Sequence, residues 1–306
     1  MKYKIAWNNK YYSWDKLTQF RKQNKLFPPP KFLNKKNNIG SNFRNLKRGK
    51  IKGIIGYDSA GPLHIGSLIP LLILLETLRH YKINDVIITI NDIEAMVLRG
   101  TGIEKSRYNI KNIEHVFKNL VKKYNKKFGT KIKPQFYIRS EMKPIWYWIS
   151  RVLLIPRIEK IIEKHYGKIP LSHLLSVLVM TGEFLRLSKN NHLLTCYGYE
   201  ELLHLSFIER IFEIMNRNFY YIICLPIRSI TNKNKKMSKS DLSSGLFLMP
   251  NNRIYLNKLK RRLKKISLDN KNGIGQFLYL WSDIFKKRLS NNIDKEVLTI
   301  IQNLVK

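Results

Sequence analysis

Two short stretches of the sequence carry side chains suited to phosphate chemistry. The first, His64-Ile65-Gly66-Ser67, follows an apolar segment and a loop of small residues, and it precedes a largely apolar run at 68–78. A strand, a glycine-containing loop and a helix in succession can bind phosphate, because small residues let the backbone approach and the helix N-terminus presents N–H groups. The second, Lys236-Met237-Ser238-Lys239-Ser240, offers two ammonium groups and two hydroxyls. Together they predict a site for a phosphorylated ligand.

Apolar strands alternate with amphipathic helices around the first stretch. Strands are predicted at 51–55, 85–90, 135–138 and 220–225, and helical segments at 68–81, 105–125, 142–188 and 200–217. Strands separated by helical crossovers favour a parallel sheet with helices on both faces. Ligands of such sheets bind at the carboxyl ends of the strands. We therefore predict a doubly wound, Rossmann-like α/β catalytic domain over residues 51–250.

The flanking segments differ from this core in composition. Residues 1–50 form a basic N-terminal extension, with a predicted helix at 14–23 and a proline triplet that favours an extended chain. This extension either contacts RNA or covers the core as a structural flap. Residues 251–306 are predicted to form a small, basic helical appendage, with helices at 255–267, 276–289 and 294–306.

The charge balance is the most unusual global property of the chain. The sequence holds 57 basic and 21 acidic residues, a net charge of +36. This balance favours a polyanionic partner, with nucleic acid ahead of an anionic membrane surface. The abundance of lysine, asparagine and isoleucine also fits coding bias in an AT-rich genome, so the charge does not identify the nucleic acid.

Other global features bear on the compartment. No apolar run approaches the length of a membrane span, and the first residues do not resemble a secretion signal. Cys196 and Cys224 have neither metal-ligand spacing nor partners for a disulfide framework. We expect a protein of a reducing compartment, the cytoplasm or an organellar matrix, with no membrane partner and no protein-bound metal.

The two polar stretches together resemble the two signature motifs of class I aminoacyl-tRNA synthetases. The run at 63–72 is similar to tyrosyl enzymes throughout, and the segment at 90–95 resembles a strand end seen in the tyrosyl/tryptophanyl subclass. The stretches at 183–187 and 198–201 resemble the amino-acid pocket helix and the Gly-x-Asp-Gln loop of that subclass. Residues 241–248 continue the second motif as in both kinds of enzyme. The resemblance covers roughly residues 50–250.

The resemblance implies a two-step reaction. The carboxylate of the amino acid attacks the α-phosphorus of ATP, which releases pyrophosphate, and the aminoacyl group then moves to the 3′-terminal hydroxyl of a tRNA. Mg²⁺ is expected to arrive with ATP rather than in a protein cage. The implied partners are tRNA and an aromatic amino acid, and a homodimer is expected from the subclass alone. The basic segment at 258–265 either contacts the tRNA backbone or forms a solvated lysine face.

The resemblance also assigns roles to matching residues. His64 would donate to a phosphate oxygen, and Lys236 and Lys239 would hold the β- and γ-phosphates as pyrophosphate leaves. Ser67 stands where the family usually has histidine or asparagine, so a modest loss of transition-state stabilisation is expected. These four form the predicted catalytic set. The predicted ATP-binding set comprises Gly56, Asp58, Gly66, Gly198, Glu200, Met237, Ser238 and Ser240.

The predicted amino-acid pocket departs from the family pattern. Ile54 replaces the tyrosine expected two residues before the first loop glycine, and Glu183 stands at the position of the pocket aspartate. Ser176 and Met180 replace a tyrosine and a glutamine, while Glu201 replaces the glutamine that contacts the amino group. Glu183 could accept a hydrogen bond from a phenol or from an indole N–H. We therefore expect an aromatic amino acid as the substrate, with tyrosine as the first choice and tryptophan as the alternative.

Two further assignments stay open at this point. Asp58 would contact either the ammonium group or the ribose, and Glu200 the ribose, although these carboxylates could instead be helix N-terminal residues favoured by the dipole. The altered pocket also leaves a different class of function open, that of a non-catalytic, synthetase-like RNA-binding protein.

Overall fold

The computed structural model of the chain describes most of its central part and two C-terminal helices. These described residues are 51–142, 144–167, 170–188, 191–198, 201–224, 237, 245–249, 257, 273–285 and 293–305. The predicted helix at 14–23, the proline triplet, all of the predicted helix at 255–267 except residue 257, and most of the second polar stretch lie outside them.

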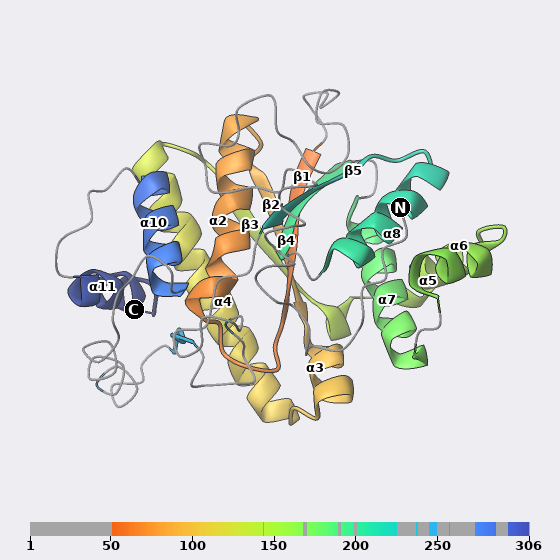
Figure 1. Cartoon of the computed structure of the whole chain (residues 1–306), viewed down its shortest axis with the longest axis horizontal. Coiled ribbons are helices and arrows are strands. Elements are labelled where there is room, and N and C mark those ends of the chain that lie inside the picture. The colour runs from red at the N-terminus through yellow and green to blue at the C-terminus, as the bar shows by residue number, and fades with distance from the viewer. Residues whose placement is uncertain are drawn as a thin grey trace.

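A five-stranded, wholly parallel sheet forms the centre of the molecule (Figure 1). Its strand order is β3-β2-β1-β4-β5, so the chain moves outward from β1 through β2 to β3 and then returns to the other side of β1. This is the doubly wound arrangement, and the prediction of fold class is confirmed. The strands are β1 (Ile51–Asp58), β2 (Asp85–Asn91), β3 (Lys133–Ile138), β4 (His192–Gly198) and β5 (Phe219–Cys224).

The sheet is covered by apolar side chains on both faces. Neighbouring residues of β1 show this division, because Ile54 packs into the hydrophobic cluster on one face and Ile55 into the cluster on the other. In β2, Ile87 and Ile88 likewise pack into different clusters. Side chains alternate along a strand, so an uninterrupted apolar run is what a sheet between two helical layers needs.

One helical layer joins elements from both ends of the described chain. Apolar side chains of all four of its helices share one hydrophobic cluster with the sheet. Its centre is the apolar helix α2, whose buried positions cover most of its circumference. The layer consists of α2 (Ile65–His80), α4 (Ile103–Phe128), α10 (Gly273–Phe285) and α11 (Ile293–Val305), which lie together on one side of the sheet in Figure 1.

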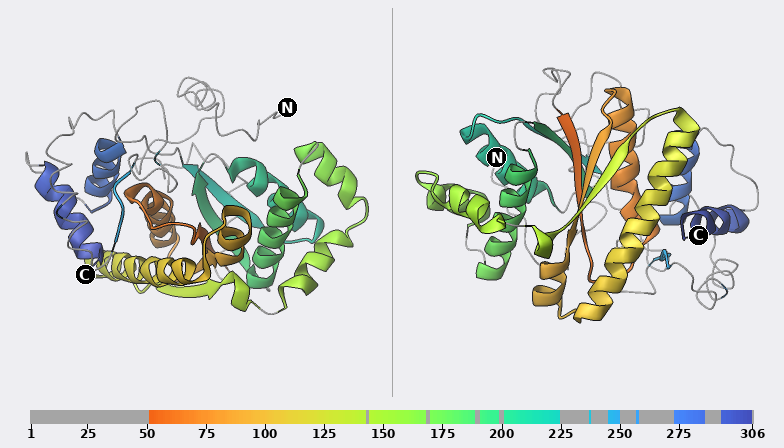
Figure 2. Two further views of the ribbon diagram at one scale, coloured as in Figure 1. Left: turned by 90° about the horizontal axis from the view of Figure 1, so that it is seen from below. Right: turned by 180° about the vertical axis from the view of Figure 1, so that it is seen from behind.

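The other layer is built by the segment between β3 and β5. Its members share the second hydrophobic cluster, in which Phe184, Phe207 and Phe212 are fully buried. The members are α5 (Ile145–Leu153), α6 (Ile158–Tyr166), α7 (Leu171–Ser188) and α8 (Leu202–Ile214). Figure 2 shows the two layers on opposite sides of the strands. Helix α3 (Asp92–Arg99) and the short 3-10 helix η2 (Arg139–Glu141) follow the carboxyl ends of β2 and β3.

The structure adds three elements to those predicted from the sequence, which are strand β4, helix α3 and the short helix η2. The long predicted helical stretch at 142–188 is divided into α5, α6 and α7. Strand β4 is essential to the topology, because it pairs with β1 on one side and β5 on the other.

Within the described residues, no single helix is long and apolar enough to cross a membrane. Helices α6 and α7 pass that test only as a pair, and they are bent by 114° relative to one another.

Candidate active site

The strand order creates a switch point at the carboxyl ends of β1 and β4. From β1 the chain crosses to β2 on one side, and β4 pairs with β1 on the other. Crossover connections leave in opposite directions at such a point, and the crevice between them is where ligands of open α/β sheets bind. The loop after β1 and the N-terminus of α2 lie here, which is where the sequence places the first polar stretch.

The segment that follows the second polar stretch is hydrogen-bonded to the first. The N–H of Ile65 donates to the carbonyl of Leu246 at 3.0 Å, and the N–H of Leu248 donates to the carbonyl of Leu63 at 2.7 Å. Residues 63–65 and 246–248 thus form a short antiparallel pairing centred on His64 and Phe247. The structure therefore joins two segments that are distant in the sequence.

Met237 is the described member of the second stretch, and it is buried. Its side chain is 4% exposed and belongs to the cluster that includes α2. Gly245 packs so closely on it that an added Cβ would lie 2.7 Å from Cγ of Met237. Met237 itself therefore lies against the α2 layer. The other four residues of this stretch, Lys236, Ser238, Lys239 and Ser240, lie outside the described residues.

His64 and Ser67 form the first turn of α2. His64 is the N-cap, and its ring meets the ring of Phe247 edge-on with centroids 6.0 Å apart. The hydroxyl of Ser67 accepts from the N–H of His64 at 3.5 Å, and the N–H of Ser67 donates to the carbonyl of His64 at 2.8 Å. The hydroxyl of Tyr57 donates to the carbonyl of Ser67 at 2.9 Å, and Gly66 lies between these contacts. The start of α2 is therefore fixed to the end of β1.

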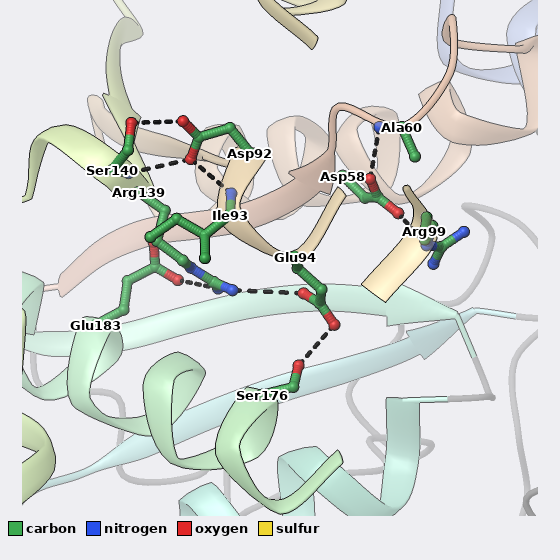
Figure 3. A network of polar contacts seen from close by, with 10 residues as sticks. All are labelled: Asp58, Ala60, Asp92, Ile93, Glu94, Arg99, Arg139, Ser140, Ser176 and Glu183. Carbon is green, nitrogen blue, oxygen red and sulfur yellow. Dashed lines mark hydrogen bonds and ion pairs between the residues drawn. The ribbon is translucent and has the colours of Figure 1, made fainter. Parts of the chain in front are cut away.

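Asp58 closes the loop at the end of β1. Its Oδ1 accepts from the N–H of Ala60 at 2.6 Å, and its Oδ2 lies 2.8 Å from Nε of Arg99 (Figure 3). One residue further, the carbonyl of Ser59 accepts from Asn109 at 2.8 Å. Contacts from α3 and α4 thus hold the loop from the side of β2.

A buried ion pair lies at the centre of the predicted amino-acid pocket. Oε2 of Glu183, on α7, lies 2.8 Å from Nη2 of Arg139, and the two side chains are 1% and 2% exposed. Burial by itself lowers the pKa of the Arg139 guanidinium, but the charges of Glu183 and Glu94 and the hydrogen bond to Glu183 raise it above its ordinary value. Oε1 of Glu183 and Nε of Arg139 are also buried, and neither has a hydrogen-bond partner among the described residues.

The ion pair continues into a polar network. Nη1 of Arg139 lies 3.4 Å from Oε2 of Glu94, and Oε1 of Glu94 accepts from the hydroxyl of Ser176 at 2.6 Å (Figure 3). Ser176 and Glu183, both predicted pocket residues on α7, are thus connected through Glu94 and Arg139, to which the sequence assigned no role. Met180 lies between them on α7 and is partly buried in the cluster on that face.

A third acidic side chain fixes the neighbouring strand ends. Oδ1 of Asp92 accepts from the N–H groups of Ile93 and Ser140 at 2.9 and 3.0 Å. The hydroxyl of Ser140 donates to Oδ2 of Asp92. The carboxyl ends of β2 and β3 are therefore tied together, which holds Glu94 and Arg139 in position.

Tyr197 reaches across the switch point toward β1. An added Cβ on Gly56 would lie 2.6 Å from the hydroxyl of Tyr197, so only glycine permits this approach. Burial raises the pKa of the Tyr197 phenol, as do the nearby charges of Glu183 and Glu201, while Arg139 and a backbone hydrogen bond with Gly56 oppose the shift. The phenol of Tyr197 is therefore close enough to Glu183 and Arg139, the buried ion pair of the predicted amino-acid pocket, to feel both charges.

The remaining predicted residues are divided between described and undescribed parts. Ile54 is fully buried in the cluster beneath α7. Gly198 ends β4, and Glu201 is the N-cap of α8. Glu200 lies outside the described residues.

Four polar residues of the network received no role from the sequence, although two of them lie in the segment at 90–95 that resembles the tyrosyl/tryptophanyl subclass. Each lies at the carboxyl end of a strand or immediately after it, where a parallel sheet binds ligands. Polar residues directly after the apolar strands at 85–90 and 135–138 were the available signal for three of them. The four are Asp92, Glu94, Arg139 and Tyr197.

The described residues contain no group of three or more histidine, cysteine, aspartate or glutamate side chains that could hold a metal ion. The acidic groups at the strand ends are instead engaged with Arg99, Arg139 and backbone N–H groups.

The strand order and the pairing of residues 63–65 with 246–248 define a doubly wound α/β protein with a candidate ligand site at the switch point of its sheet. The model of the family "tRNA synthetases class I (W and Y)" matches residues 46–304. The chain therefore belongs to the class I tRNA synthetase family that includes the tryptophanyl and tyrosyl enzymes. No curated protein matches the chain.

Solved structures with the same fold include both kinds of enzyme. Tyrosyl-tRNA synthetase from Aeropyrum pernix aligns with a TM-score of 0.60 at 15% identity, over 84% of this chain and 85% of that one. Tryptophanyl-tRNA synthetase from Aeropyrum pernix K1 aligns with a TM-score of 0.58 at 15% identity, over 84% and 79%. Tyrosyl-tRNA synthetase from Archaeoglobus fulgidus, complexed with L-tyrosine, gives 0.57 at 13% identity, over 85% and 90%. Structural likeness alone thus does not distinguish the two amino acids.

Proposed function

We propose that this protein activates tyrosine with ATP and transfers the tyrosyl group to the 3′ end of tRNA(Tyr). Membership of the class I family supports the reaction type. The choice of tyrosine rests on one observation, the buried pair of Arg139 and Glu183, which leaves one acceptor atom and one donor atom without partners among the described residues.

The pairing of residues 63–65 with residues 246–248, which follow the second polar stretch, supports the first step. The carboxylate oxygen of tyrosine attacks the α-phosphorus, and the bond from that phosphorus to the oxygen of the leaving pyrophosphate breaks. Negative charge that develops on the phosphates needs preorganised donors. His64 and the N-terminus of α2 supply donors from the first polar stretch, and Lys236 and Lys239 supply ammonium groups from the second. Mg²⁺ would enter with ATP, and it would neutralise phosphate charge.

The surplus of acid at the strand ends favours the substrate's ammonium group. Asp58, Asp92, Glu94 and Glu183 provide four carboxylates, whereas the network holds two guanidinium groups. Glu94 is the most accessible acidic member of the Arg139 network, with a side chain that is 25% exposed. A cationic group close to Glu94 would balance this charge.

The hydroxyl of tyrosine matches the two remaining polar atoms. It can donate to Oε1 of Glu183 and accept from Nε of Arg139, which satisfies both buried groups. An indole N–H only donates, so tryptophan would leave Nε of Arg139 without a partner. Each unsatisfied buried group costs about 1–3 kcal/mol, and sites that bind a substrate hydroxyl reject the analogue lacking it by roughly 10⁴–10⁵-fold.

Exchange of labelled pyrophosphate into ATP, measured with each amino acid in turn, tests the proposal. We expect tyrosine to stimulate exchange, phenylalanine not to do so, and the variant Lys236→Ala/Lys239→Ala to lose exchange while it retains RNA binding. Stimulation by tryptophan and not by tyrosine would refute the choice of substrate in favour of the tryptophanyl enzyme.

Tyr197 favours a second candidate, a non-catalytic synthetase-like RNA-binding protein. Its phenol approaches Gly56 and faces Glu183 and Arg139, so it offers within the chain the group that a tyrosine substrate would bring. If wild-type protein binds RNA but shows no exchange with any amino acid, this second candidate replaces the first. Tyrosine-dependent exchange that appears only in Tyr197→Ala would likewise favour the second candidate for the natural protein.

We further propose that the protein is a homodimer of a reducing compartment, the cytoplasm or an organellar matrix. Exposed aromatic and aliphatic side chains on α5 support an association surface, with Trp146 and Tyr147 65% and 57% exposed. Sedimentation of wild type and of Trp146→Ser/Tyr147→Ser tests this, and a wild-type monomer at micromolar concentration would refute it.

A further inference from the structure

Positive charge is distributed unevenly among the helices that the structure describes. Helix α4 carries eight basic and two acidic side chains, a net charge of +6 over 26 residues. The other described α-helices each have a net charge between −1 and +1. A coding bias toward lysine would raise the charge of every helix, so the concentration on α4 needs a separate explanation.

The charges of α4 form a continuous face. Five exposed basic residues recur at intervals of four or seven positions, which places them on one side of a helix with 3.6 residues per turn. The buried residues of α4, among them Ile113, Phe117 and Leu120, lie on the opposite side. This basic face extends over roughly 28 Å at 1.5 Å per residue. It consists of Arg107, Lys111, Lys118, Lys122 and Lys126.

The basic face begins beside the candidate active site. In the first turns of α4, Oγ of Ser106 lies 2.6 Å from Oγ of Ser59, and Asn109 donates to the carbonyl of Ser59 at 2.8 Å. Ser59 directly follows Asp58 in the loop after β1. From this point α4 runs along the outside of the molecule next to β3, as the right-hand view of Figure 2 shows.

We propose that the basic face of α4 binds the phosphate backbone of the RNA substrate and leads it toward the active site. Phosphate contacts by lysine and arginine supply affinity and orientation without reading sequence. That this RNA is the tRNA to be charged rests on the proposed function. That an RNA is bound here rests on the charge, exposure and position of α4.

The packing of α4 argues against two other partners. A helix that binds a membrane surface buries its apolar face between lipids, but the apolar face of α4 is packed against the sheet and α2. A second copy of this chain would have to offer a matching acidic helix. No described helix has a net charge below −1.

Two triple variants with the same change in charge test the proposal. The first, Lys111→Gln/Lys122→Gln/Lys126→Gln, neutralises the basic face but leaves Lys118, which pairs with Glu114 at 3.0 Å. The control, Lys82→Gln/Lys160→Gln/Lys164→Gln, neutralises three exposed lysines outside α4. Binding of a tRNA(Tyr) transcript is measured by fluorescence anisotropy from 0.05 to 0.3 M salt. Thermal midpoints verify that both variants are folded.

We expect the α4 variant to bind roughly 100-fold more weakly at 0.1 M salt, with a slope of log Kd against log salt lower by about 2–3. The control should stay within about threefold of wild type. Equal losses in both variants, or no loss in the α4 variant, would overturn the proposal. So would wild-type binding to phosphatidylserine vesicles that exceeds RNA binding and depends on α4.

Pyrophosphate exchange separates this inference from the proposed function, because the first step needs no tRNA. Both triple variants should exchange as wild type does. If wild type shows no exchange while the α4 variant still loses RNA affinity, the proposed function fails and the inference stands. If exchange is normal and the α4 variant binds RNA normally, only the inference fails.

Discussion

Arg139 and Glu183 are almost completely withdrawn from solvent, and each neutralises the other at 2.8 Å. Removing one partner of a buried pair leaves an uncompensated charge, which typically costs about 3–5 kcal/mol. We therefore expect Arg139→Leu to lower the free energy of unfolding by about that amount in urea titrations at pH 7.

The double variant Arg139→Leu/Glu183→Leu is the control for this prediction. With neither charge buried, it should be more stable than Arg139→Leu, because a pair replaced by apolar side chains of similar size is often neutral. A double variant less stable than either single variant would show that the two charges do not compensate each other. Exchange with tyrosine should be lost in every one of these variants.

The two members of this ion pair differ in whether the sequence could predict them. Glu183 was indicated by its resemblance to the pocket aspartate, and the structure places it in the Arg139 network at the strand ends. Its partner Arg139 could not be indicated, because it is 44 positions away and follows a different strand. Pairing of two charges across a sheet depends on strand order, and no local pattern contains that information.

At the scale of elements, the pairing of 63–65 with 246–248 is the contact on which catalysis should depend most. Phe247 is 1% exposed and meets the ring of His64. Phe247→Leu should keep the backbone pairing but shift the imidazole, and small displacements of reacting groups cost up to about 100-fold in rate. We expect the exchange rate to fall about 10- to 100-fold.

The matched control for this prediction is Phe277→Leu in α10, which removes a similarly buried ring from the hydrophobic cluster of the α2 layer. Both variants should lose similar stability, and only Phe247→Leu should lose exchange. An equal loss of exchange in the two variants would mean that stability and not the position of His64 limits the rate.

The contact between α6 and α8 gives the fold a dependence on pH. Burial lowers the pKa of His204 to about 4, with a further contribution from the charge of His173, and its Nδ1 lies 3.2 Å from the hydroxyl of Tyr166. Below its ordinary pKa of 6.5 the unfolded histidine binds a proton that the folded one does not. The free energy of unfolding should therefore fall between pH 6.5 and pH 4, by an amount on the order of 3 kcal/mol.

His204→Asn should abolish this part of the pH dependence, since an amide can keep the contact with Tyr166 but does not titrate. Urea titrations of both proteins at pH 7, 5.5 and 4 give the comparison. Carboxylates titrate equally in the two proteins, so the difference between the curves isolates His204. Parallel curves would contradict the prediction. Burial also lowers the pKa of His165, which acts in the same direction.

Elements differ in how well their sequences predict them. Helix α4 is predicted because its apolar positions recur at helical spacing, and β2 because residues 86–90 are all β-branched and mostly apolar. Strand β4 was missed because His192, Thr195 and Gly198 interrupt its apolar pattern. Its strand character comes from pairing with β1 and β5 on both sides, a tertiary effect that outweighs local preference.

For the molecule as a whole, the sheet couples the two hydrophobic clusters. Adjacent residues of one strand point into different clusters, as Ile54 and Ile55 do in β1. The loss of either helical layer would expose one face of the same five strands. The two layers should therefore unfold together, and the active site, which takes residues from both, should be lost in that single transition.

Two alanine variants, one in each cluster, test this coupling. Phe117, on α4, and Phe207, on α8, are both fully buried, and Phe→Ala substitutions at such positions cost about 3–5 kcal/mol. The fluorescence of two tryptophans can report on the two layers separately, because Trp281 in α10 belongs to the first cluster and Trp148 in α5 packs against the second.

Single-tryptophan proteins that retain one of these residues allow the unfolding of each layer to be followed by fluorescence in urea. We expect either alanine variant to lower the midpoint equally for both tryptophans, because a shared sheet cannot release one layer alone. A midpoint that shifts only for the tryptophan on the altered side would show that the layers unfold separately.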